Sequence, residues 1–470
     1  YLTTKNYEAA LKSINKIKHP STKILEAKQD ILFQLGTQAF ANVKLDDAVS
    51  LFSQAIQLGS YNMEARNDAY FWRGESYYRM GEYENAISDY RTYLNNTRQR
   101  NTDMYALAYY NLGYSYFKLR DYSAALNRFR QYVDLESNRQ AASLADAYNR
   151  IGDCLYQNRQ FSLAEENYSR AVQLSPSAGD YSIYQKGFLL GLQKDYKGKI
   201  SAMDRLISEY PESQYVDDAL FEKGRSYVLL ENSSSAAQAF EKLIREFPQS
   251  SLARKAGIQL GLLYYNDNQP EKALAAYKQV ISNYPGSEEA KIALQDLKSV
   301  YIDLNDINAY ASYVNSIGGN IRLEVGEQDS LTYIASEKLF MRGDNDGARR
   351  SLINYLQTLP EGAFSSNANF YLGSIAFAKK EFDEAIQRFK SVIASGDTKF
   401  LEESVARTAE IEYLSKDYPA ALESFKRLLI VAENPENRQA ARLGIMRCAL
   451  QTGQQKDALL AADELLKEPK

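Results

Sequence analysis

A small residue recurs along this chain every 35 to 39 positions, and a second small residue usually follows it after twelve. In the first part of the chain the pairs are Gly36 and Ala48, Gly74 and Ala86, Gly113 and Ala125, Gly152 and Ala164, Gly224 and Ala236, and Gly261 and Ala273, with a weaker unit at Gly187 and Lys199 between the fourth and the fifth. Further along, Ser336 and Ala348, Gly373 and Ala385, and Ala409 and Ala421 keep the spacing. A period in this range predicts helix pairs that stack on one another, and it overrides the usual expectation of about three globular domains for 470 residues.

One unit can be followed in residues 106–132. Leu112, Gly113 and Tyr116 fall on one stripe at helical spacing, and a second apolar stripe that includes Phe129 begins after a short polar turn. We expect two antiparallel helices of about a dozen residues each, with small residues where their backbones cross closely. One such pair cannot bury its outer apolar face alone, so neighbouring pairs must stack on it.

The pattern resembles the tetratricopeptide repeat family over essentially the whole chain. The best matching sets are Tyr148, Ile151, Gly152, Leu155, Ala164, Tyr168, Ala171 and Pro176; Phe221, Gly224, Tyr227, Ala236, Phe240 and Pro248; and Leu260, Gly261, Tyr264, Ala273, Tyr277 and Pro285. The resemblance implies an all-α fold, a right-handed superhelical α-solenoid of about twelve helix-turn-helix units. Repeated Tyr-Pro and Phe-Pro phrases, such as those at Pro211 and Pro248, are similar to repeats of bacterial envelope proteins, namely the Tol–Pal-associated coordinator and the outer-membrane-assembly lipoprotein.

Some units depart from the pattern. Lys199 stands at a small position, and the unit at Lys298 and Tyr310 is placed by phase alone. In the final unit Gly444 and Ala458 are fourteen residues apart, and Met446 is the alternative for the first small position. We expect looser or differently angled joints there.

Four segments are expected along the chain. Residues 1–20 are interpreted as the truncated remnant of a preceding unit, because the chain opens in the middle of a repeat, and residues 21–317 as the main array. Residues 318–330 form an irregular loop, with alternation typical of a short extended segment at 321–325, and residues 331–470 continue the array. A hinge between two sub-arrays at this loop is the alternative.

Composition excludes several classes of function. Lys and Arg number 56 against 60 Asp and Glu, a net charge of −4, whereas nucleic-acid binding needs a concentrated basic surface. No apolar stretch approaches the roughly twenty residues needed to span a bilayer. With His19 as the sole histidine, and Cys154 and Cys448 distant in sequence and expected to be buried, we predict no catalytic residues, no metal site and no cofactor.

The family resemblance also implies where a partner would bind, because the first helix of each unit lines the concave groove of such arrays. If the small residue is position eight, position five faces the groove. It holds Phe33, Phe71, Tyr110, Asn149, Tyr184, Phe221, Ile258 and Phe370. Position two carries Asp30, Asp68, Asp146 and Asp218. Such an aromatic stripe edged by acids would hold a segment with apolar and basic groups, although the same residues also suit packing and helix N-termini.

A chaperone-tail receptor is not expected. Members of the family that bind chaperone tails clamp a carboxylate with basic and amide residues. Here the corresponding early positions hold Phe33, Thr37, Phe71 and Glu75.

We therefore expect a non-catalytic adaptor that binds another protein or peptide segment, within a larger periplasmic or cell-envelope protein. Two alternatives remain open: a regulatory or targeting arm of an enzyme whose catalytic domain lies elsewhere, and a self-association module. The oligomeric state is left open.

Overall fold

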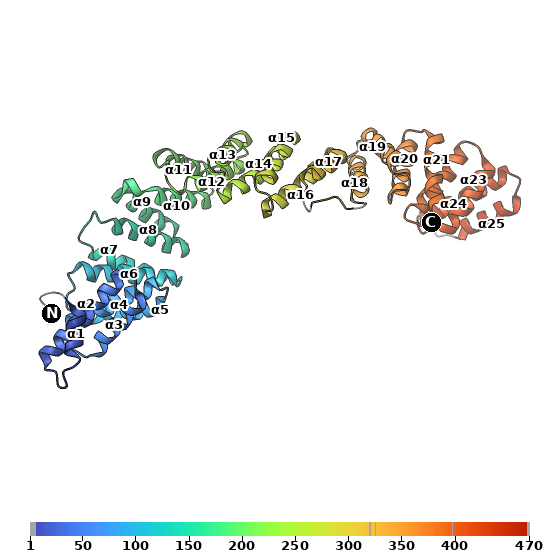
Figure 1. Cartoon of the computed structure of the whole chain (residues 1–470). Coiled ribbons are helices and arrows are strands. Elements are labelled where there is room, and N and C mark those ends of the chain that lie inside the picture. Colours follow the sequence, from blue (N-terminus) through green and yellow to red (C-terminus); the bar gives the residue numbers. More distant parts are fainter. Residues whose placement is uncertain (1–5, 319–320, 325, 397, 468–470) are drawn as a thin grey trace. The chain divides into compact units, whose positions relative to one another are not determined.

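The all-α fold predicted from the period is confirmed. The computed structural model describes residues 6–318, 321–324, 326–396 and 398–467, and these form 25 α-helices, one short 3-10 helix and no strand (Figure 1). Contacts along the chain divide it into two compact units, Tyr1–Leu263 and Tyr264–Lys470.

The first unit contains thirteen complete α-helices and the 3-10 helix. They are α1 (Tyr7–Ile14), α2 (Thr22–Ala41), α3 (Leu45–Gln57), α4 (Met63–Arg79), α5 (Tyr83–Asn96), α6 (Asp103–Lys118), α7 (Tyr122–Leu135), α8 (Ala142–Gln157), α9 (Phe161–Leu174), the 3-10 helix Pro176–Ala178, α10 (Asp180–Leu192), α11 (Tyr196–Glu209), α12 (Val216–Leu229) and α13 (Ser233–Glu246). From α2 to α13 they pack as six consecutive helix pairs.

The second unit continues in the same manner after α14 (Ser251–Asn266), which spans the division. Its helices are α15 (Pro270–Asn283), α16 (Glu288–Asp303), α17 (Ile307–Ile317), α18 (Glu327–Met341), α19 (Asn345–Thr358), α20 (Ser365–Ala378), α21 (Phe382–Ser395), α22 (Leu401–Leu414), α23 (Tyr418–Val431), α24 (Pro435–Gln451) and α25 (Gln455–Lys467). The helices from α16 to α25 form five more pairs, so that with the six of the first unit eleven pairs are described, close to the predicted number of about twelve.

In several pairs an aromatic side chain packs directly on the glycine, which explains why the spacing recurs from pair to pair. A Cβ atom added to Gly36 or Gly224 would lie 2.5 Å from the ring of Phe52 or Phe240. Each of these rings comes sixteen residues after its glycine and is fully buried. The glycine thus makes room for a ring from the second helix, and the free energy gained by ring burial offsets the cost of glycine in a helix.

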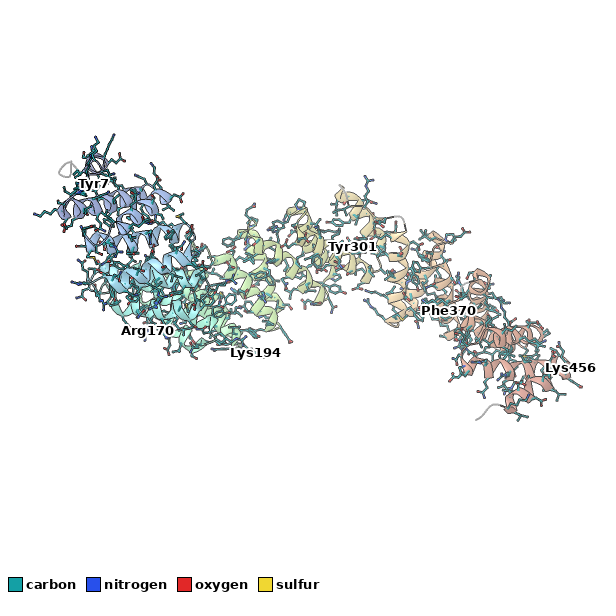
Figure 2. All side chains as sticks on the ribbon, turned by 90° about the horizontal axis from the view of Figure 1, so that it is seen from below. Tyr7, Arg170, Lys194, Tyr301, Phe370 and Lys456 are labelled. Carbon is teal, nitrogen blue, oxygen red and sulfur yellow. The ribbon has the colours of Figure 1, made fainter. Side chains whose placement is uncertain are left out.

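The turn inside each pair has a recurrent left-handed residue. Twelve residues, each seven after a first small position, have φ between 54° and 83°: Val43, Gly81, Arg120, Arg159, Lys194 (labelled in Figure 2), Glu231, Asn268, Asn305, Gly343, Lys380, Lys416 and Gly453. After α6 the Arg120 N–H donates to the carbonyl of Phe117 (2.9 Å) and the Asp121 N–H to that of Tyr116 (3.0 Å), which closes the helix end. The Asp121 carboxylate then accepts from the Ala124 N–H and begins α7.

This turn also establishes the phase of two irregular units. Asn305 is left-handed seven residues after Lys298, and Gly453 is left-handed seven residues after Met446. Met446 therefore occupies the small position of the last unit. Gly444 instead faces the preceding pair, since a Cβ there would lie 2.5 Å from the ring of Phe425.

The predicted division into segments 1–20, 21–317, 318–330 and 331–470 stays a prediction. In the opening segment, α1 packs on α2 through Ala10 and Leu35, whereas residues 1–5 lie outside the described residues. α18 begins at Glu327, inside the predicted loop 318–330, and residues 321–324 form neither helix nor strand. Residues 319–320 and 325, which belong to the same prediction, lie outside the described residues.

Candidate functional site

The residues predicted to face a partner lie on first helices, from α2 to α14 and on α20, and their exposure differs. Partly exposed are Phe33, Tyr110, Tyr184, Phe221, Ile258 and Phe370, together with Asp30, Asp68, Asp146 and Asp218. Phe71 and Asn149 are buried, with 2% and 8% of their surface exposed. These two side chains are therefore covered by the protein and do not form part of an exposed surface.

Contacts of Phe71 and Asn149 explain their burial. The Phe71 ring centroid lies 5.4 Å from those of Trp72 and Tyr93 in edge-to-face geometry. The Asn149 carbonyl oxygen accepts a hydrogen bond of 2.7 Å from the Ser182 hydroxyl on the next first helix. Both side chains therefore hold neighbouring helices together.

Three other predicted residues pack against neighbouring aromatic rings and keep part of their own surface exposed. Phe33 lies 6.0 Å from Phe52, and Phe221 lies 5.9 Å from Phe240, measured between ring centroids. Phe370, labelled in Figure 2, stacks on Phe400 at 4.3 Å with an interplanar angle of 14°.

Tyr184 belongs to an aromatic group formed by α10 and by Tyr215, the residue that precedes α12. Its ring stacks on Tyr215 (5.5 Å, 17°) and meets the edge of Phe188 at 5.1 Å. Burial raises the pKa of the Tyr184 hydroxyl, and the nearby Asp218 carboxylate raises it further. Burial, with Asp217 next, raises the pKa of Asp218. The structure thus brings Tyr184 and Asp218 into one neighbourhood.

Lys199, which breaks the small-residue rule, lies in the interface between α11 and its neighbours. Its ammonium group forms an ion pair of 2.6 Å with Glu222 and lies 4.8 Å from the centre of the Phe188 ring. Gly191 leaves room for the aliphatic stem, because a Cβ atom there would lie 2.9 Å from Lys199 Cδ. A buried charge is tolerated here because it is paired.

Asp146 and Tyr110 are brought together by the structure. The Asp146 carboxylate accepts hydrogen bonds from the hydroxyls of Tyr110 (2.7 Å) and Tyr114. Arg150, one turn further along α8, lies 3.7 Å from the same carboxylate. The negative charge predicted to edge the groove is therefore already hydrogen-bonded within the protein.

A second carboxylate completes this network. Asp153 accepts from Tyr168 (2.6 Å) and Tyr181 (2.7 Å) and pairs with Arg150 at 2.7 Å, while the Arg150 guanidinium lies 4.9 Å from the centre of the Tyr181 ring. Burial raises the pKa of Asp153, opposed by Arg150 and the two hydroxyls. We name the group Asp146, Arg150, Asp153 and their tyrosines the tyrosine–carboxylate network.

Sequence reasoning missed this network. Asp153 directly follows Gly152, and Tyr168 comes sixteen residues after that glycine. Glu75 and Tyr90 have the same spacing around Gly74, and the Tyr90 hydroxyl donates to Glu75 at 2.8 Å. An acid directly after the glycine, with a tyrosine sixteen residues after the same glycine, is the sequence pattern that could have predicted these hydrogen bonds.

Asp68 and Asp30 differ from Asp146. Among the described residues, no side chain or backbone donor hydrogen-bonds to the carboxylate of either one, although both stand at the same repeat position as Asp146. Burial first, and then Glu64, raise the pKa of Asp68 to about 6.

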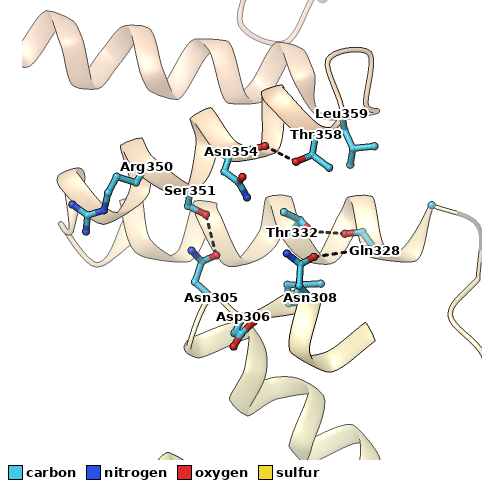
Figure 3. Close-up of a pocket in the computed structure, with 12 residues that line it drawn as sticks. Asn305, Asp306, Asn308, Gln328, Thr332, Arg350, Ser351, Asn354, Thr358 and Leu359 are labelled. Atoms are coloured by element: carbon cyan, nitrogen blue, oxygen red, sulfur yellow. Dashed lines mark hydrogen bonds between the residues drawn. The ribbon is translucent and has the colours of Figure 1, made fainter. Parts of the chain in front are cut away.

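The second unit contains a polar cavity of about 510 Å³ beside α17, α18 and α19 (Figure 3). The Ser351 hydroxyl donates to Asn305 at 2.9 Å, and the Gln328 side-chain amide donates to Asn308 at 3.2 Å (Figure 3). These polar groups form hydrogen bonds with one another, so they do not converge as free donors or acceptors for a ligand.

Within the described part of the chain, no cluster of three or more His, Cys, Asp or Glu side chains is placed to hold a metal ion. No described helix is long and apolar enough to cross a membrane. Both cysteines are buried, and burial raises the pKa of Cys154 to about 12, which makes its thiol a poor nucleophile at neutral pH.

Comparison with protein families places repeats along the chain. The profile described as tetratricopeptide repeat matches residues 33–103 and 110–179, and a second profile with the same description matches residues 181–213. Residues 217–295 match the family described as outer membrane lipoprotein. No curated protein sequence matches the chain.

Solved structures with similar folds include several proteins of this kind. The C-terminal part of a TPR repeat-containing protein from Cytophaga hutchinsonii is 20% identical, covers 56% of this chain and 99% of its own, and has a TM-score of 0.47. A tetratricopeptide repeat protein from Parabacteroides merdae is 16% identical, with coverages of 58% and 98% and a TM-score of 0.39. YrrB, described as a TPR protein with an unusual peptide-binding site, is 23% identical, with coverages of 44% and 96% and a TM-score of 0.34.

The profile matches agree with the helix pairs, the glycine–aromatic packing and the recurrent left-handed turn, which continue beyond the matched residues. Residues 33–103, 110–179 and 181–213 are therefore tetratricopeptide repeats, and such repeats indicate a scaffold for protein interactions.

Proposed function

We propose that this chain is a non-catalytic scaffold that binds an extended or helical segment of a partner protein along the first helices of its repeats. Tyr184 carries the proposal, because its ring is partly exposed and already held in place by Tyr215 and Phe188. A rigid aromatic side chain loses little conformational entropy when it is covered, and such residues are enriched at the centres of protein interfaces.

The proposed place of action is the bacterial cell envelope. The support is the match of residues 217–295 to the outer membrane lipoprotein family. Fractionation of native cells tests this directly: we expect antibody against the chain to detect it in the envelope fraction, and recovery with the cytosol alone would contradict the proposal.

A photo-crosslinking experiment tests the binding face. A benzophenone amino acid replaces Tyr184 or Phe221 on first helices, or Arg130, which is exposed on the second helix α7, as the matched control. We expect one and the same protein to crosslink in native cells to the two first-helix positions and not to Arg130.

The other outcomes discriminate between functions. A partner captured only at Arg130 would place binding on the opposite helices and contradict the proposal. Crosslinks between two copies of the chain would favour self-association. Thermal melting of each variant shows whether the replaced side chain was needed for folding.

A further inference from the structure

A cavity of about 280 Å³ lies where α4 begins, next to the segment that joins α5 to α6. Its lining residues are Met63, Glu64, Asn67, Asp68, Asn96, Thr97, Arg98 and Gln99. All of them belong to the first unit. We refer to it below as the α4 cavity.

Acceptor groups in the α4 cavity lack donors. The Asp68 carboxylate receives no hydrogen bond from any described residue. Asn67 is 7% exposed; its side-chain amide donates to the Asn96 carbonyl at 3.5 Å, whereas its buried side-chain oxygen has no partner. A buried acceptor without a donor is unfavourable, so a donor group that reaches the Asn67 side-chain oxygen would stabilise this arrangement.

Charge is unbalanced in the same place. Glu64 and Asp68 are four residues apart on α4, a spacing that puts two like charges on one face of a helix. Arg98 is the cation among the lining residues, but its side chain is exposed and forms no ion pair with either carboxylate in the described structure. The cavity therefore presents three acceptor groups and two negative charges.

These properties specify the chemistry of an occupant. It must be positively charged and must offer several hydrogen-bond donors to separate acceptors. A guanidinium group offers five donors in one plane, and an ammonium group offers three. Too few carboxylates converge for a metal site, since the described residues contain no cluster of three metal-ligating side chains.

We propose that the α4 cavity is a subsite for a basic side chain, arginine foremost, of the partner segment; this inference rests on the proposed function. The cation would pair with Asp68 and Glu64 and supply the donor that the Asn67 side-chain oxygen lacks. Burying such a charge pair fixes the register of the segment along the repeats.

Binding should depend on pH through Asp68. The charged or titratable groups facing this carboxylate are Glu64 on α4, Tyr93 on α5 and Arg98 in the segment before α6. With its pKa raised to about 6, Asp68 is ionised at pH 7 and becomes protonated as the pH falls below 6. The affinity for a cation should therefore decrease between pH 7 and pH 5.

The subsite can be tested without knowledge of the partner. Met63 lines the cavity and is one of six methionines, so ¹³C-methyl labelling of methionine gives a resolved local signal that Met63→Leu assigns. The probes are N-acetyl-arginine amide and N-acetyl-citrulline amide, which has nearly the same shape without the charge. We expect the arginine probe to shift the Met63 signal saturably, with a Kd on the order of 1 mM, and the citrulline probe to bind at least about tenfold more weakly.

Matched variants separate the subsite from general electrostatics. Asp68→Asn should weaken arginine binding about tenfold, whereas Glu84→Gln, an exposed acid on α5 outside the cavity, should leave it unchanged. Arg98→Ala should tighten binding two- to threefold by removing a like charge, on the order of what one exposed charge contributes.

Several results would overturn the inference. They are equal shifts with both probes, binding that survives Asp68→Asn, or binding that occurs only after Arg98→Ala, which would mean that the chain's own arginine fills the cavity. If the probe fails while Tyr184 still crosslinks a partner, the subsite is wrong and the scaffold function stands. If the probe binds while no partner crosslinks, the proposed binding face is wrong and the cavity remains a cation site.

Discussion

Two repeats of the first unit, α4–α5 and α8–α9, use the same sequence pattern with different results. In both, a tyrosine sixteen residues after the glycine donates its hydroxyl to the acid that follows the glycine, Tyr90 to Glu75 and Tyr168 to Asp153. The acid at position two differs. Asp146 accepts two tyrosine hydroxyls, and Asp68 accepts none among the described residues.

The preceding repeat accounts for this difference. The hydroxyls that reach Asp146 come from Tyr110 and Tyr114 on α6. The corresponding residues before Asp68 are Phe33, which has no hydroxyl, and Thr37, whose hydroxyl donates to the Gln34 carbonyl at 2.8 Å. Whether an acid is structural or available to a ligand therefore depends on the neighbouring repeat, and not on its own position.

The largest expected effect breaks the network of α8–α9. Asp153→Ala removes the acceptor of the buried Tyr168 and the partly buried Tyr181 and leaves Arg150 with Asp146 alone, so the free energy of unfolding should fall by about 3 kcal/mol. The matched change Glu75→Ala removes the acceptor of the Tyr90 hydroxyl and of the Asn111 side-chain amide. It should cost less, about 1–2 kcal/mol, because it does not take the nearest carboxylate from a mostly buried arginine. Urea denaturation followed by circular dichroism compares the two, and equal losses would contradict the ranking.

The second test uses the glycines of the same two repeats. A Cβ atom at Gly152 would lie 2.7 Å from the Tyr168 ring, whereas at Gly74 the nearest atoms of Asp89 and Tyr90 are 3.3 Å away. Gly152→Ala should therefore destabilise the protein by about 2 kcal/mol through overpacking. Gly74→Ala should change stability by less than about 1 kcal/mol, because the helix propensity of alanine offsets the tighter contact. Thermal melting of both variants decides, and a larger loss at Gly74 would show that the two interfaces are packed in the reverse order.

Periodicity predicted the helices because the close approach of two helices requires small residues at a fixed spacing, and Gly113 with Phe129 satisfies that requirement locally. Two results were not predictable by that route. Arg120, Lys194 and Glu231 adopt a left-handed conformation that their side chains do not favour. Phe71 is buried because Trp72 and Tyr93 cover it, which depends on residues outside its stripe.

The pairing of charges was also hidden from the sequence. Lys199 on α11 and Glu222 on α12 are 23 residues apart, and their 2.6 Å contact depends on how successive pairs stack. The same holds for Asp146 and Tyr110, which are 36 residues apart. Within one helix a pattern determines which residues share a face, whereas contacts between repeats depend on stacking geometry that no single pattern contains.

The third test makes the comparison between the two acids direct. Asp146→Asn removes a charged acceptor of the Tyr110 and Tyr114 hydroxyls and weakens the contact with Arg150. Hydrogen bonds to charged groups are stronger than neutral ones, so we expect a loss of about 1–2 kcal/mol in urea denaturation at pH 7. No loss would mean that water satisfies the two hydroxyls equally well.

The same substitution at Asp68 should have the opposite sign. The folded pKa of Asp68, about 6, is above its ordinary value of 3.8, so folding favours the protonated form. That contribution to stability is fully present below about pH 3.8 and is lost as the pH rises through about 6. Asp68→Asn stays neutral at every pH, and at pH 7 it should therefore be more stable than the wild type.

The expected gain is small. A shift of this size corresponds to at most about 3 kcal/mol, and because the side chain is partly exposed, screening by solvent reduces it to about 1 kcal/mol. Trp72, the single tryptophan, lies on α4 beside Phe71 and reports the urea midpoint of this repeat by fluorescence. The gain should be present at pH 7 and absent near pH 4. A loss of stability at pH 7, as expected for Asp146→Asn, would instead show that Asp68 has a donor in the folded chain, and the two repeats would then use their acids alike.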